Sequence, residues 1–248
     1  MSARWQFSPG LWPTVATLVL ALVMSWLGLW QLDRAAQKEA LFDRFARAVE
    51  SPSATIATRG DLATIAATDG PLYEPVAVSG RYEPQRQFLL DNQVRNGEPG
   101  HEVLTPLRMT DGTVLMVNRG WRAQGRTRQD LPDVSVTGER LQVRGLLRRF
   151  PQPGLRLGQA SMEPGWPRLV HYPEPEDIAA ALDEPVAPLM LLLDAEDPHG
   201  YRRDWRPAVP GPARHYGYAL QWFALTAALL AIYVIVNSRR RRRESPDE

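Results

Sequence analysis

Two uncharged apolar runs, one near each end, constrain this chain more than any other feature. They occupy residues 11–32 (LWPTVATLVLALVMSWLGLWQL) and 216–236 (YGYALQWFALTAALLAIYVIV). At about 1.5 Å of rise per residue, a helix of either length reaches about 30 Å, the thickness of the hydrocarbon core of a bilayer. The residues between the runs are polar and rich in proline and arginine. The sequence therefore predicts a water-soluble domain that both of its ends hold at one face of a membrane.

The charges near the spans predict which side of the membrane holds the domain. Two spans place both termini on one side, and five consecutive arginines follow the second span at 239–243. A simple count of basic residues favours the opposite orientation, but long translocated domains are largely exempt from the positive-inside rule. We therefore expect cytoplasmic termini. The predicted parts are a cytoplasmic tail at 1–10, a span at 11–32, an extracytoplasmic domain at 33–214, a span at 215–236 and a basic cytoplasmic tail at 237–248.

The first apolar run is predicted to be a permanent anchor rather than a cleaved signal peptide. Its apolar core exceeds the ~7–15 residues usual for a signal, and no small-residue cleavage site follows it. A charged stretch with helical periodicity comes next, in which Leu41 and Phe45 lie one turn apart. We therefore expect one long helix that continues out of the membrane.

Composition excludes several classes of chemistry. The chain contains no cysteine, which excludes disulfides, thiol catalysis, iron–sulfur ligation by cysteine and covalent attachment of c-type haem. Its formal net charge is +1, so nothing in the charge balance indicates a nucleic-acid partner.

The central domain reads as a series of strands with few helices. Alternating or apolar segments separated by turn residues predict strands, and Asp111-Gly112 is a typical hairpin turn. Pro106 is expected to interrupt one of these strands. The fold class predicted is α+β: an antiparallel, sheet-dominated domain, with a closed barrel as one option, flanked by two transmembrane helices. Strands are predicted at 76–82, 87–91, 102–109, 114–118, 141–149, 168–172 and 189–194, and helices at 61–67, with Asp61 as its cap, and 175–182.

Familiar catalytic motifs such as G-x-S-x-G and H-E-x-x-H are missing. The four histidines are far apart in the sequence, and no two have metal-site spacing, which argues against a zinc site. His215 differs from the other three because it begins the second span. Tyr218 and Trp222 follow it at i+3 and i+7, so the three side chains share one helical face.

Aromatic residues on the first span match these in depth. Trp26 and Trp30 share a face, and side-by-side packing of the spans would bring them to Trp222 and Tyr218. The simpler interpretation is an aromatic belt at the headgroups, which suits Trp30 and Tyr218 but not the deeper Trp26 and Trp222. The sharper hypothesis is a flat apolar ligand such as haem. His215 would be its axial ligand, aromatic side chains its walls, and Arg214 would lie near its propionates.

An Asn-Arg-Gly-Trp corner ends the predicted strand at 114–118. The preferred interpretation of Gly120 and Trp121 is structural, because glycine permits a turn and tryptophan fills a core. Arg119 is open to either of two roles, a structural one or the docking of a partner or a propionate.

Several of these segments together make the chain resemble the Surfeit-locus-one family of cytochrome c oxidase assembly factors. The resemblance implies a protein of the bacterial inner membrane whose domain lies on the periplasmic side. It also implies a non-catalytic role in delivering haem a to the catalytic subunit of the oxidase, with His215 as the haem-linked histidine and the enzyme that makes haem a as a further candidate partner. The segments are GLWQLDR at 28–34 with Lys38, GRY at 80–82, TPL at 105–107, VNRGW at 117–121 and HYGYALQWF at 215–223.

Three other functions remain alternatives. An assembly scaffold would bind the oxidase subunit without holding haem. A membrane-anchored hydrolase would need a polar pocket of converging titratable groups in the domain. A transporter or sensor subunit is the weakest alternative, because two uncharged spans offer no ion pathway.

Overall fold

The computed structural model describes residues 4–68, 72–125, 127, 130–151, 165–207 and 209–241. The predicted tail beyond residue 241, including the last two arginines of its basic run, lies outside the described residues. Contacts divide the chain into two units. One unit contains Met1–Asp43 and Ala208–Glu248, and the other contains Arg44–Pro207.

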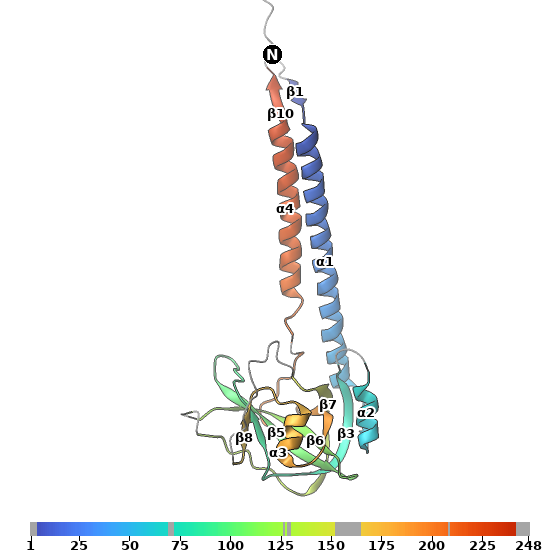
Figure 1. Cartoon of the computed structure of the whole chain (residues 1–248), viewed down its shortest axis with the longest axis vertical. Helices are drawn as coiled ribbons and strands as arrows, with labels where there is room; N and C mark the ends of the chain where they lie inside the picture. The colour runs from blue at the N-terminus through green and yellow to red at the C-terminus, as the bar shows by residue number, and fades with distance from the viewer. Residues whose placement is uncertain are drawn as a thin grey trace, which may run out of the picture. The chain divides into compact units, whose positions relative to one another are not determined.

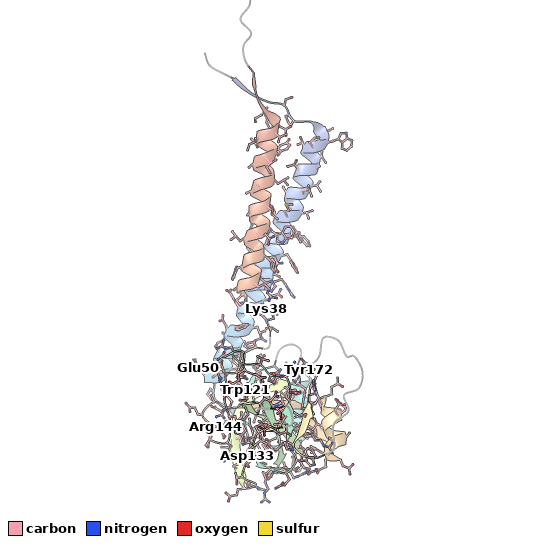
Figure 2. The ribbon with its side chains drawn as sticks, turned by 90° about the vertical axis from the view of Figure 1, so that its left-hand side faces the viewer. Lys38, Glu50, Trp121, Asp133, Arg144 and Tyr172 are labelled. Atoms are coloured by element: carbon pink, nitrogen blue, oxygen red, sulfur yellow. The ribbon has the colours of Figure 1, made fainter. Side chains whose placement is uncertain are left out.

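The first unit is built on two long helices, α1 (Leu11–Glu50) and α4 (Ala213–Asn237), which run side by side in opposite directions (Figure 1). The 40 residues of α1 form one continuous helix, marked along its course by Lys38 and Glu50 in Figure 2, which confirms the predicted extension beyond the apolar run. Two short strands that the sequence analysis did not predict, β1 (Arg4–Phe7) and β10 (Ser238–Arg241), pair antiparallel. β1 precedes the start of α1, and β10 follows the end of α4.

Both helices are long and apolar enough to cross a membrane. Their most apolar windows have mean hydropathies of 1.9 and 2.1, yet only 11% and 6% of these windows are buried. A helix that is apolar all round must be covered by protein or by lipid. The exposure of these windows is compatible with insertion of both helices into a membrane.

The second unit is a sheet-dominated domain around a closed barrel of five strands, in the order β3-β7-β9-β6-β5, with β5 returning to pair with β3. This confirms the predicted fold class. Three pairings, β2–β3, β4–β8 and β6–β9, are parallel, a detail that the sequence did not indicate. The barrel strands are β3 (Glu74–Tyr82), β5 (Gly100–Met109), β6 (Val114–Ala123), β7 (Arg140–Arg149) and β9 (Val186–Leu193).

Shorter elements extend the barrel. β2 (Ala54–Ile56) adds an edge strand that the sequence analysis missed, while β4 (Phe88–Leu90) and β8 (Arg168–Val170) extend the sheet beside β5. Helix α3 (Pro175–Leu182) has the predicted bounds. Helix α2 (Arg59–Ala66) is capped by Thr58, not by Asp61 as predicted; Asp61 instead completes a capping box by accepting from the backbone of Thr58.

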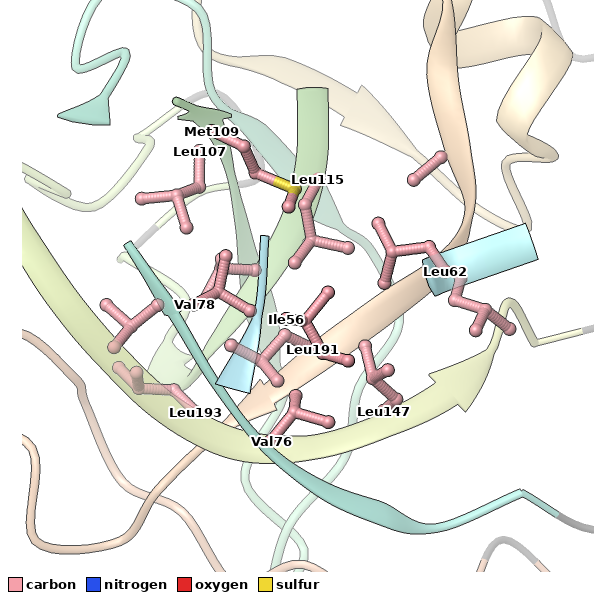
Figure 3. Packing of buried hydrophobic residues seen from close by; sticks show 14 of the residues in the cluster. Ile56, Leu62, Val76, Val78, Leu107, Met109, Leu115, Leu147, Leu191 and Leu193 are labelled. Atoms are coloured by element: carbon pink, nitrogen blue, oxygen red, sulfur yellow. The ribbon is translucent and has the colours of Figure 1, made fainter. Parts of the chain in front are cut away.

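Side chains that alternate along the strands fill the barrel. Leu115 and Val117 of β6 point into one apolar cluster, whereas Val114 and Met116 belong to a second cluster under α3. Both faces of β6 are therefore buried, which explains its nearly continuous apolar sequence. Figure 3 shows the first cluster, to which every barrel strand contributes.

The predicted interruption at Pro106 is wrong, because β5 continues through it. Phe88 of β4 pairs with Leu104, and Tyr82 of β3 pairs with Leu107, so the neighbour of β5 changes between these positions. Pro106 lies at this change of neighbour, where the proline carbonyl accepts a bond from the Glu83 amide at 2.9 Å. A missing N–H is tolerated where no neighbouring strand requires it.

Four charged side chains join the connection between β3 and β4, strand β5 and the segment after α3. Arg108 forms an ion pair with Glu83, and its Nη1 lies 2.6 Å from Oε2 of Glu184. Nη2 of Arg86 lies 2.7 Å from Oε2 of Glu83 and 3.0 Å from Oε1 of Glu184. Hydrogen bonds from Arg108 and then from Arg86 lower the pKa of the Glu184 carboxyl. The network therefore favours the ionised carboxylate in the folded state.

Glu184 should make the domain more stable at neutral pH than in acid. Because its folded pKa is lowered, its contribution is present above the ordinary pKa of glutamate and is lost as the pH falls through the folded value. We expect Glu184→Gln to lower the thermal midpoint of the full chain at pH 7 and to have less effect near pH 4. Glu139→Gln, at an exposed position, is the control. If Glu184→Gln lowered the thermal midpoint equally at pH 7 and pH 4, this role of Glu184 would be contradicted.

A side chain at Gly28 should force α1 and α4 apart. A Cβ built there would lie 2.7 Å from Cε1 and Cζ of the Phe223 ring. In this cysteine-free chain, a short bifunctional thiol reagent should link Thr14→Cys to Tyr233→Cys, whose native side chains touch at 2.6 Å. Adding Gly28→Leu should abolish the link, whereas adding Ala16→Leu, at an exposed position, should not. Equal linkage in both would refute the packing.

Candidate functional site

Small side chains line the face that α1 turns toward α4. Gly28 and Ala35 are buried, and Thr14, Thr17 and Ala21 are partly buried, while the positions between them are mostly exposed. These residues recur three or four positions apart, the spacing of one helical face. Small side chains let two helices approach closely in an apolar environment.

The corresponding face of α4 carries His215. Ala219 is buried there, while His215, Trp222 and Thr226 are partly buried. Nδ1 of His215 lies 2.8 Å from Oε1 of Gln31 on α1. The imidazole is therefore held between the two helices by an amide oxygen.

Two further polar contacts cross the helix pair. The hydroxyls of Thr14 and Tyr233 lie 2.6 Å apart near one end of the pair. Beyond the apolar run of α1, the Tyr216 hydroxyl donates to Glu39 at 2.9 Å. Together with the hydrogen bond that Gln31 accepts from His215, these contacts fix the register of the two helices.

Only part of the predicted aromatic pocket forms between the helices. Trp222 lies on the facing surface of α4, but Trp26 is 63% exposed, Trp30 is 46% exposed and Tyr218 is 48% exposed. The prediction that Trp26 and Trp30 pack against Tyr218 and Trp222 across the pair is therefore wrong. The cause is that the small residues of α1, rather than its tryptophans, occupy the contact. Arg214, the predicted neighbour of a propionate, is exposed.

Arg119 lies inside the barrel domain and is 2% exposed. Its Nε donates to the His199 carbonyl at 2.7 Å, Nη1 to the Val134 carbonyl at 2.9 Å, and Nη2 to the Ser135 carbonyl at 3.1 Å. Its guanidinium also lies 4.9 Å from the ring centroid of Tyr201. Burial lowers the pKa of this guanidinium. Of its two predicted roles, the geometry fits the structural one and leaves nothing of Arg119 on a docking surface.

The predicted corner that ends the strand at 118 is wrong, because β6 continues through Gly120 and Trp121 to Ala123. Both neighbours of Arg119 nevertheless have structural roles. Gly120 adopts a φ of +105°, and a Cβ there would lie 2.9 Å from the Arg202 carbonyl, so only glycine fits without strain. Trp121, labelled in Figure 2, is 5% exposed and donates from Nε1 to the Gln93 carbonyl at 2.7 Å.

The barrel domain also gathers two histidines that the sequence keeps apart. His101 is fully buried with Nδ1 3.2 Å from Asp91, and Nε2 of the half-exposed His171 lies 3.7 Å from the same carboxylate. Sequence reasoning missed this cluster, although Asp91 directly follows β4, whose strand partner is β5. Within the described parts of the chain, no group of three or more candidate ligands has the geometry to hold a metal ion.

A groove of about 790 Å³ opens on the barrel domain beside the end of α1. Arg144, labelled in Figure 2, lines it together with Asp194 and Glu196. Arg203, also at this groove, donates to the carbonyls of Ala195 and Asp197 and so holds a loop in place. No histidine is among the described residues that line the groove, so it lacks the commonest general base.

Comparison with known proteins identifies the family. A SURF1-like protein of Monosiga brevicollis is 26% identical over 244 residues, covering 90% of this chain and 87% of the relative. A SURF1-like protein of Rickettsia conorii is 23% identical over 86% of each chain. An uncharacterized SURF1-like protein of Mycobacterium bovis is 26% identical over 95% of this chain and 88% of its own length. The SURF1 family itself matches residues 18–227, and the chain therefore belongs to the SURF1 family.

Proposed function

We propose that this protein is an assembly factor for cytochrome c oxidase that binds haem a at its two apolar helices and assists its delivery to the catalytic subunit. The SURF1 family is a family of oxidase assembly factors rather than of enzymes. The observation that carries the proposal for haem is the position of His215, partly buried on the face of α4 that meets α1.

The residues near His215 suit an iron porphyrin in part. An imidazole nitrogen is a common axial ligand of haem iron, and haem a, when bound, supplies the iron centre that the oxidase needs for electron transfer and oxygen chemistry. Trp222 offers a flat apolar surface on the same face of α4, two turns from His215. Trp26, Trp30 and Tyr218, which point away from the pair, do not form walls between the helices. The site proposed is therefore His215 with Trp222, and Arg214 as the nearest cation in the sequence.

The other histidines do not compete for this role. His101 is buried inside the barrel domain, and His171 and His199 lie against carboxylates at its surface. Of the four histidines in the chain, His215 is the one that belongs to an apolar helix. An apolar cofactor that enters from the membrane would meet that histidine first.

The proposed location is the inner membrane of a bacterium, with the barrel domain in the periplasm and both termini in the cytoplasm. Two relatives named above come from bacteria, and both long helices are compatible with membrane insertion. The partners proposed are the membrane, the catalytic subunit of the oxidase and the enzyme that makes haem a.

One observation favours a second candidate function. Three of the aromatic residues expected to enclose a ligand are exposed on the outside of the helix pair. Such side chains can pack against helices of another membrane protein. A scaffold that binds the oxidase subunit without holding haem would use this surface, and the next experiment separates the two functions.

Replacing His215 should abolish haem binding. We expect His215→Ala, purified from cells that make haem a, to carry little haem, because the methyl group of alanine cannot bind iron as the imidazole does. His171→Ala and His199→Ala, both altered at accessible side chains, are the controls and should retain the wild-type ratio of haem to protein. His101 is a poor control because its side chain is fully buried. Equal haem content in all variants would favour the scaffold.

The orientation can be tested with single cysteines. Val94→Cys, at a position 59% exposed on the barrel domain, should react in spheroplasts with a thiol reagent that cannot cross membranes. Glu248→Cys, at the end of the chain, should react only after lysis. Labelling of Glu248→Cys in spheroplasts, with Val94→Cys labelled only after lysis, would place the domain in the cytoplasm and contradict the proposed orientation.

A further inference from the structure

The contact between Gln31 and His215 joins two polar groups inside a largely apolar helix pair. Gln31 lies near the end of the uncharged run of α1, and His215 lies in the first turn of α4. The two side chains meet at 2.8 Å. In apolar surroundings a polar side chain is disfavoured unless it is paired, so each of these groups requires the other.

The chemistry of the contact determines where the imidazole carries its hydrogen. The amide oxygen Oε1 of Gln31 only accepts hydrogen bonds. Nδ1 of His215 must therefore carry the hydrogen and donate it. In a neutral imidazole the other nitrogen, Nε2, then keeps its lone pair, which is the form in which a histidine nitrogen binds a metal.

We propose that Gln31 is a positioning residue that selects the Nδ1–H tautomer of His215, fixes the orientation of its ring and so presents Nε2 as the nitrogen that binds haem iron. This inference rests on the proposed function. Histidines that bind metals usually donate their other N–H to an acceptor, which raises the basicity of the coordinating nitrogen. Gln31 occupies the place of that acceptor.

A glutamine suits this position better than a carboxylate does. A carboxylate here, close to the end of the apolar run, would be the stronger acceptor but would add a negative charge at a cost in stability. The amide gives a directed acceptor without net charge. Gly28 lies one turn from Gln31 on the same face and lets α4 come close, and the contacts of Thr14 with Tyr233 and of Glu39 with Tyr216 hold the register on either side.

The alternative is that Gln31 only joins the two helices. In that case its loss would weaken the pairing of α1 with α4 without changing the electronic character of a bound haem. Crosslinking of Thr14→Cys to Tyr233→Cys measures the pairing, and the midpoint potential of the haem iron measures the basicity of its ligand. The two roles therefore give different results.

The test uses the full chain in detergent with three variants. Gln31→Leu removes the acceptor, Gln31→Glu strengthens it, and Gln221→Leu is the matched control because it removes an exposed glutamine from α4. Haem a is titrated into each haem-free protein, and the midpoint potential is measured. Nitrogen NMR of histidine-labelled, haem-free protein, with His215→Ala to assign the signal, reports the tautomer.

We expect Gln31→Leu to weaken haem a binding by about 10–100-fold, to raise the midpoint potential and to abolish the preference for Nδ1–H, with crosslinking retained. Gln31→Glu should keep binding and lower the potential, and Gln221→Leu should match the wild type. A wild-type tautomer, affinity and potential in Gln31→Leu would overturn the role of Gln31. Loss of crosslinking with an unchanged potential would assign it to helix pairing alone. Haem retained by His215→Ala would instead refute the proposed site, while the haem-free NMR still tests the hydrogen bond.

Discussion

Polar groups on the facing surfaces of α1 and α4 need partners within the helix pair, because the apolar side chains around them offer none. This requirement explains why Gln31 contacts His215 and why Thr14 contacts Tyr233. It also sets the distance between the helices, since these bonds form only where small residues such as Gly28 let the backbones approach. A partly buried histidine whose ring is oriented in advance is the consequence that matters for the proposed binding of haem.

The barrel domain satisfies a related requirement in a different way. Its buried cation, Arg119, has no carboxylate among its hydrogen-bond partners in the described part of the chain; it donates to backbone carbonyls and lies over the Tyr201 ring. The segments that carry His199, Val134 and Ser135 are thereby attached to β6. Arginine is suited to this task because its five donors lie in a fixed plane. The domain thus uses its interior arginine to hold loops in place.

Much of the fold was predictable because local signals were strong. The continuous apolar runs, the Asp111-Gly112 hairpin and the bounds of α3 follow from periodicity and turn chemistry. The site was predicted only in part, because periodicity shows which side chains share a face but not which face meets the partner. The small residues of α1 form the contact with α4, so Trp26 and Trp30 are exposed on the outer surface of the helix pair. Gln31 could have been singled out as a polar residue in an apolar run, the usual sign of a role within a membrane.

The central claim is that the helix pair holds haem a on His215. The most direct test is the absorption spectrum of the purified wild-type protein, prepared from cells that make haem a and from cells that cannot. The account predicts a Soret band and the long-wavelength band of haem a in the first preparation only, with the bands lost in His215→Ala. A protein that is folded and inserted in the membrane but shows no haem spectrum in either preparation would contradict it.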